Sequence, residues 1–87
     1  QEYIEPRVMM SPQEAFYAEK ESLPLRETEG RICSEFVMCY PPGIPVITPG
    51  EIFNKKIIES IDRYVESGAN MYGIDLHKMV SICTEEG

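Results

Sequence analysis

The feature that most constrains this sequence is a proline-rich segment at residues 40–45, which reads Tyr40-Pro41-Pro42-Gly43-Ile44-Pro45. Each proline ring fixes φ near about −65° and removes a backbone amide donor, so the segment cannot form a helix or the centre of a sheet. We expect a rigid, extended connector with a single flexible joint at Gly43. The remaining elements have to fold on either side of this connector.

The chain before the connector contains one helix start and one strand. Ser11-Pro12-Gln13-Glu14 has the residues of a capping box with proline at the first helical position. We expect a helix to about Ala18 that buries Ala15 and either Phe16 or Tyr17. Residues 23–25 are predicted to be extended, residues 27–30 to form a turn, and residues 31–39 to form a central strand, because both of its faces are apolar.

The chain after the connector contains the clearest helix. We expect a short strand at 46–48, a turn at 49–50, and a helix from the cap Asn54 to Gly68 whose apolar residues recur at helical spacing. Thr48 is a rival start for this helix. A last strand is predicted at 77–83. These elements predict a small α+β domain with short mixed strands and two main helices over residues 11–87, preceded by a linker or edge segment at 1–10.

Composition excludes several classes of function. The 87 residues carry a net charge of −7 and no basic run, which disfavours binding to nucleic acids or to an anionic membrane surface. No apolar stretch is long enough to cross a bilayer. The cysteines Cys33, Cys39 and Cys83 are odd in number and lack metal-ligand spacing, and His77 is the only histidine. We therefore expect reduced thiols in a cytoplasmic protein and no metal site.

Four pieces of the sequence, in order, resemble one family. They are the run from Ser11 to Ala18, the segment with Leu23-Pro24-Leu25 followed by Glu29-Gly30-Arg31-Ile32, the string from Glu35 to Pro45, and Pro49-Gly50-Glu51. Together they resemble the C-terminal domain of the bacterial ornithine/lysine/arginine decarboxylases. The resemblance covers about three quarters of the chain.

The resemblance implies the properties of a larger parent enzyme. Such enzymes hold pyridoxal phosphate on a lysine and decarboxylate arginine, lysine or ornithine to agmatine or a diamine, and among these substrates we prefer arginine. They assemble as dimers or larger even-numbered oligomers, and the C-terminal domain packs against the catalytic domain near the active-site entrance. The family's cofactor lysine lies in an upstream Ser-x-His-Lys motif. Here His77-Lys78 follows Asp75-Leu76, so we expect no catalytic or cofactor-binding residue in this chain.

Two groups of residues are candidates for contact with the parent's active-site entrance. The first is the string Tyr40 to Pro45, which either docks on the catalytic domain or is a stiff connection between two strands. The second is Pro49-Gly50-Glu51. The carboxylate of Glu51 either binds the cationic end of a substrate or is an ordinary solvated acid near a helix start.

Two hypotheses about the whole protein are left open. Because the sequence begins at Gln1 without an initiator methionine, we expect a fragment of a decarboxylase whose catalytic domain lies upstream. The alternative is a stand-alone acidic protein-interaction module without catalysis. The first hypothesis predicts an apolar patch that is normally covered by the catalytic domain.

Overall fold

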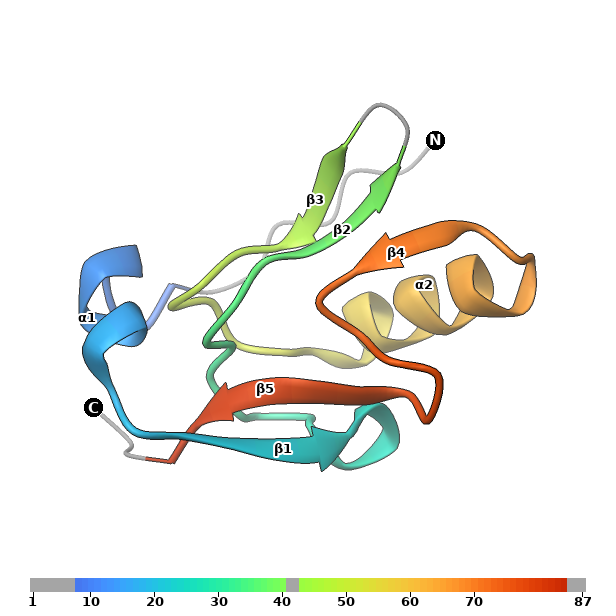
Figure 1. Ribbon diagram of the computed structural model, residues 1–87. Coiled ribbons are helices and arrows are strands. Elements are labelled where there is room, and N and C mark those ends of the chain that lie inside the picture. The colour runs from blue at the N-terminus through green and yellow to red at the C-terminus, as the bar shows by residue number, and fades with distance from the viewer. Residues whose placement is uncertain (1–7, 41–42, 85–87) are drawn as a thin grey trace.

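The computed structural model describes residues 8–40 and 43–84. Its two sheets are antiparallel, with the strand orders β3-β2-β4 and β1-β5 (Figure 1). The predicted α+β class with two main helices is confirmed. In chain order the elements are α1 (Pro12–Tyr17), β1 (Lys20–Pro24), the 3-10 helix η1 (Leu25–Glu27), β2 (Val37–Tyr40), β3 (Ile44–Ile47), α2 (Lys55–Glu66), β4 (Asn70–Tyr72) and β5 (Met79–Cys83).

Single antiparallel bridges extend the β1-β5 sheet on the β5 side. Residue pairs Cys33–Ile82, Ile32–Ile52 and Val8–Glu51 form these bridges. Backbone pairing therefore continues from β1 and β5 through residues 32–33 and 51–52 to the segment at 8–10. This segment is the described part of the predicted linker 1–10, and it forms the outer edge of the ladder.

The predicted strand over residues 31–39 is wrong in its extent. Ile32 and Cys33 form the bridges that extend the β1-β5 sheet, whereas β2 begins only at Val37 and belongs to the β3-β2-β4 sheet. Between them the chain bends, the thiol of Cys33 donates to the carbonyl oxygen of Glu35 at 2.7 Å, and the buried Ser34 hydroxyl lies 2.6 Å from that of Ser81. The apolar pattern continues because the chain crosses from one sheet to the other while staying in the core. β2 is central in its sheet, as expected.

The core lies between the two sheets and α2. Phe53, Ile57 and Ile61 are completely buried and pack with Val37, Ile47, Val80 and Ile82 from the strands. Asn54 caps α2, since its side-chain oxygen accepts from the Ile57 amide at 2.8 Å. The predicted start at Asn54 is therefore confirmed, and the rival start at Thr48 is wrong.

Helix α1 differs from the prediction in the face that it buries. The capping box is confirmed, because the Ser11 hydroxyl accepts from the Glu14 amide at 3.0 Å and the Glu14 carboxylate accepts from the Ser11 amide at 2.8 Å. Only Ala15 is buried, while Phe16 and Tyr17 are 64% and 76% exposed. A helix of six residues turns fewer than two times, so one small side chain suffices for its contact with the core.

The extended piece predicted at 23–25 is the end of β1, which begins at Lys20, and Leu25 instead starts η1. Strand β4 was not expected, and β5 begins two residues later than predicted. β1 has the sequence Lys-Glu-Ser-Leu-Pro and lies at a sheet edge, where charge and proline are tolerated. β4 has only three residues, too few for a periodic pattern. Among the described residues, no helix is long and apolar enough to cross a membrane.

Candidate functional site

The predicted connector is a hairpin turn. Tyr40 ends β2, Gly43 has φ +90°, and Ile44 begins β3. The strand predicted at 46–48 therefore starts two residues earlier, at Ile44. Pro41 and Pro42 lie outside the described residues. Pro45 lies in β3, which is an edge strand, and there its missing amide removes no bond from a sheet centre. The side chains of Tyr40 and Ile44, at the ends of β2 and β3 that face the turn, are exposed. The β2-β3 hairpin projects from the rest of the chain in Figure 1.

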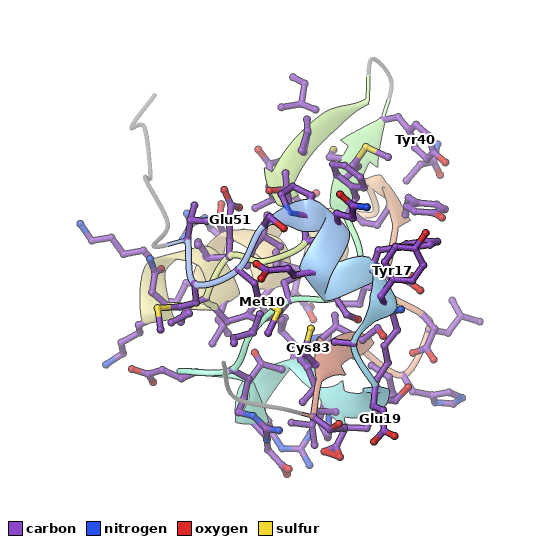
Figure 2. All side chains as sticks on the ribbon, turned by 90° about the vertical axis from the view of Figure 1, so that its left-hand side faces the viewer. Met10, Tyr17, Glu19, Tyr40, Glu51 and Cys83 are labelled. Atoms are coloured by element: carbon purple, nitrogen blue, oxygen red, sulfur yellow. The ribbon has the colours of Figure 1, made fainter. Side chains whose placement is uncertain are left out.

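The second predicted group lies at the opposite end of β3. Pro49 and Gly50 are buried, and the carboxylate of Glu51 accepts from the Thr48 amide at 2.8 Å. The four residues of β3 span about 13 Å. The structure therefore does not bring Tyr40 and Glu51 together, and Figure 2 places them on opposite sides of the molecule.

Exposed aromatic side chains lie on the outer face of the β3-β2-β4 sheet, which includes Tyr40, and on α1. Strand alternation puts Phe36, Met38 and Tyr40 on the face of the sheet opposite Val37, which is buried in the core. Tyr72 pairs with Met38 across β2 and β4, so it lies on this same face. We call this surface, together with two residues of α1, the aromatic face; its members are Phe16, Tyr17, Phe36, Tyr40 and Tyr72.

Helix α1 adds its two rings on the same side of the molecule. The rings of Phe16 and Tyr17 meet edge to face, with centroids 5.2 Å apart. Figure 2 shows Tyr17 and Tyr40 on the same side. Large apolar side chains are thus exposed on α1 and on this sheet, and their burial by a catalytic domain stays a prediction. Of the members of the aromatic face, only Tyr40 was a predicted site residue; the short α1 and β4 gave no signal for the others.

The His77-Lys78 pair lies in the turn before β5. Lys78 has φ +60°, and its ammonium group donates to the carboxylates of Asp62 and Glu66, each at 2.7 Å. These hydrogen bonds, first to Asp62 and then to Glu66, raise the pKa of Lys78 above its ordinary value. A lysine that forms a Schiff base has to be a neutral amine, which this environment opposes.

Asp75 closes the turn in which this pair lies. Its carboxylate accepts from the Met79 amide at 3.0 Å and from the His77 amide at 2.9 Å. The hydrogen bond from Met79, followed by that from His77, lowers the pKa of Asp75. Asp75 therefore has a structural role in shaping the turn.

Cys33 and Cys83 are buried, whereas Cys39 is half-buried. Burial raises the pKa of Cys33 to about 12, which opposes formation of the reactive thiolate. The described part of the chain holds no cluster of three or more histidine, cysteine or acidic residues that would bind a metal ion.

Comparison with known proteins identifies the family. A model of the family "Orn/Lys/Arg decarboxylase, C-terminal domain" matches residues 2–76. The chain is 47% identical over 68 residues to an arginine decarboxylase of Bacillus subtilis, covering 78% of this chain and 14% of that protein. It is 41% identical over 70 residues to the inducible ornithine decarboxylase of Escherichia coli, covering 76% of this chain and 9% of that protein.

Solved structures agree in fold. The constitutive lysine decarboxylase of E. coli superimposes with a TM-score of 0.77 at 23% identity, over 91% of this chain and 14% of that one. Lysine decarboxylase A of Pseudomonas aeruginosa gives a TM-score of 0.68 at 27% identity, over 93% of this chain and 14% of that one. The chain thus spans about one seventh of these relatives. It belongs to the family of Orn/Lys/Arg decarboxylase C-terminal domains.

Proposed function

We propose that this chain is the C-terminal part of a pyridoxal-phosphate-dependent decarboxylase of a basic amino acid. In this proposal it supplies a packing surface near the active-site entrance and no catalytic group. The relatives that support it are named arginine, ornithine and lysine decarboxylases, and each is many times longer than the matched segment. The structural observation that carries the proposal is the aromatic face.

The aromatic face needs a covering partner. Its five aromatic side chains come from α1, β4 and the β2 segment, and all are substantially exposed. A soluble domain of this size rarely leaves so many large apolar groups in water unless they form a contact. The partner we propose is the upstream catalytic part of the same polypeptide, which in the relatives makes up most of the chain.

We assign the end of the β2-β3 hairpin to the active-site entrance; of its residues, Tyr40 belongs to the aromatic face, whereas Ile44 pairs with Cys39 and lies on the other face of the sheet. The hairpin end carries Tyr40 and Ile44, which belong to the proline-rich motif, and its prolines limit the conformations that have to be frozen on docking. The carboxylate of Glu51 is instead engaged within the chain, because it accepts a hydrogen bond from the Thr48 amide. We therefore give the contact role to Tyr40 and Ile44.

The cofactor does not fit the described residues. Bound pyridoxal phosphate supplies an electron sink for the carbanion left when carbon dioxide departs. Lys78, which has the histidine neighbour of a cofactor lysine, is held as an ammonium ion by two carboxylates. We therefore place the cofactor and the catalytic lysine in the upstream part.

The substrate we propose is arginine, in preference to lysine or ornithine. The arginine decarboxylases of B. subtilis and Bacillus anthracis are 47% and 46% identical to this chain, compared with 41% and 42% for an ornithine and a lysine decarboxylase. We further propose that the whole enzyme is cytoplasmic and assembles as a homo-oligomer.

Expression of the whole reading frame that encodes this chain tests the proposal. The purified protein, supplied with pyridoxal phosphate, is expected to show the visible absorbance of bound cofactor and to release carbon dioxide from arginine faster than from lysine or ornithine. The 87-residue domain alone is the control and should do neither. A whole protein that binds no cofactor would contradict the proposal and favour the acidic interaction module.

A further inference from the structure

We infer that the turn at residues 48–51, which contains Pro49-Gly50-Glu51, anchors the segment that enters the domain and so fixes how the domain is oriented on the upstream part. We call it the anchoring turn. The anchoring itself depends only on contacts within this chain. The consequence for domain orientation rests on the proposed function.

Gly50 links the entering segment to the core through its backbone. Its carbonyl oxygen accepts from the amides of Met9 at 2.8 Å and Met10 at 3.2 Å, and Val8 forms a bridge with Glu51. On its other side, the Gly50 amide donates to the carbonyl oxygen of Cys33 at 2.8 Å, and Cys33 is completely buried. The entering segment is thus bonded to a residue that is itself bonded to the core.

The approach of the segment to Gly50 is closer than a side chain would permit. A Cβ atom at this position would lie 2.0 Å from the carbonyl oxygen of Met10, and the residue has φ +95°. Gly30 and Gly68 also have positive φ, yet a Cβ atom there would meet nothing within 4 Å. Glycine at position 50 is therefore required by the entering segment as well as by the turn.

The turn is stabilised by its own residues. The Glu51 carboxylate accepts from the Thr48 amide at 2.8 Å, and the Glu51 amide donates to the Thr48 carbonyl oxygen at 3.2 Å. Pro49 is buried and has a restricted φ. The anchoring turn, which receives Met9 and Met10, is consequently held in shape by its own contacts and not by the entering segment.

The anchored segment leads directly into the aromatic face. Met10 packs beside Ala15 and Cys83, and the next residue, Ser11, caps α1. Helix α1 carries Phe16 and Tyr17. Release of the segment from Gly50 would therefore free the start of α1 and change the position of these two rings relative to the sheet.

The test compares variants of the whole protein by hydrogen exchange of the peptide that contains Met9 and Met10. Gly50→Ala should speed exchange of these amides by about tenfold or more, because their acceptor is displaced. Gly68→Ala is the matched control with positive φ and open space, and it should leave this peptide unchanged. Trypsin cleavage after Arg7 should increase in the first variant only.

A second pair of variants keeps the test decisive where Gly50→Ala unfolds the domain, which exchange in α2 would reveal. Glu51→Gln keeps an oxygen acceptor for the Thr48 amide and should leave the Met9 and Met10 peptide protected, whereas Glu51→Ala should expose it. Equal exchange in these two variants, or no change in a folded Gly50→Ala protein, would overturn the anchoring role.

The effect on the orientation of the domain is measured separately, by hydrogen exchange of the aromatic face. In a folded Gly50→Ala protein, peptides of the aromatic face should lose protection relative to the Gly68→Ala control. If the Met9 and Met10 peptide is exposed while the face stays protected, the orientation claim is overturned and the anchoring stands. Cofactor binding by the unsubstituted protein decides the proposed function independently of these measurements.

Discussion

Substitution of Tyr40 and Tyr72 by serine is the most direct perturbation of the proposed docking surface. Both rings lie on the face of the β3-β2-β4 sheet that points away from the core, so their removal leaves no internal cavity. The two residues are 42% and 48% exposed. The double variant should therefore fold as the unsubstituted domain does and should differ only in how it docks.

The expected loss follows from the exposed area. A tyrosine buries roughly 200 Å² when it is completely covered, so each of these rings leaves about 90 Å² in contact with water. At about 25 cal/mol per Å², covering each one contributes about 2 kcal/mol. Because such areas overestimate the contribution to binding, we expect the double variant to weaken docking by about 3 kcal/mol, or roughly a hundredfold in the docking equilibrium.

Hydrogen exchange in the whole protein measures this loss. Peptides that cover residues 36–40 and 70–73 should be protected by docking and should lose that protection in the double variant. Leu76→Ser is the matched control, because Leu76 is 97% exposed in the turn between β4 and β5 and does not belong to the aromatic face. Equal protection in the double variant and the control would refute a covered aromatic face.

Three further outcomes are expected for the domain. Cys33, whose pKa is raised to about 12 by burial, should be alkylated in the folded state about a thousandfold more slowly than an ordinary thiol, and labelling as fast as that of Cys39 would contradict this. Gly73→Ala places a Cβ atom 2.1 Å from a backbone carbonyl oxygen, so urea unfolding should show about 1–3 kcal/mol more destabilisation than for Gly68→Ala. Asp75→Ala should destabilise the domain at neutral pH. Because the folded-state pKa of Asp75 is lowered, its contribution is present above the ordinary carboxyl pKa and is lost as the pH falls through the folded-state value, so the two urea midpoints should converge in acid.

Local chemistry accounts for the parts of the fold that the sequence predicted. The caps at Ser11 and Asn54 act within three residues of their own positions, and the structure contains both. Gly30, in the turn expected at residues 27–30, has φ +85°. Prolines likewise act on their own backbone, and Pro45 accordingly lies in an edge strand. The expectation that residues 40–45 avoid the sheet centre is wrong for Tyr40, which ends the central strand β2.

The parts that could not be predicted depend on contacts between distant residues. The apolar pattern over residues 31–39 would be the same if these residues formed one strand or if their two halves lay in different sheets. Only the pairing of Cys33 with Ile82 in one sheet and of Met38 with Tyr72 in the other distinguishes the two arrangements. Parts of the candidate site could not be predicted for the same reason. Tyr40 was found through its motif, whereas the requirement for glycine at position 50 arises from Met10, forty residues away in the sequence.

We propose separate roles for the two groups of motif residues, Tyr40 to Pro45 and Pro49 to Glu51. Tyr40 and Ile44 present a contact surface at one end of β3, and Gly50 holds the entering segment at the other end. A strand with proline near one end and a tight turn at the other has few conformations to lose on docking. Because the same short strand joins the contact surface to the anchored entry point, a movement at Gly50 should be transmitted to the hairpin end. In our proposals, the motif residues therefore fix both where the domain is attached and which surface it presents.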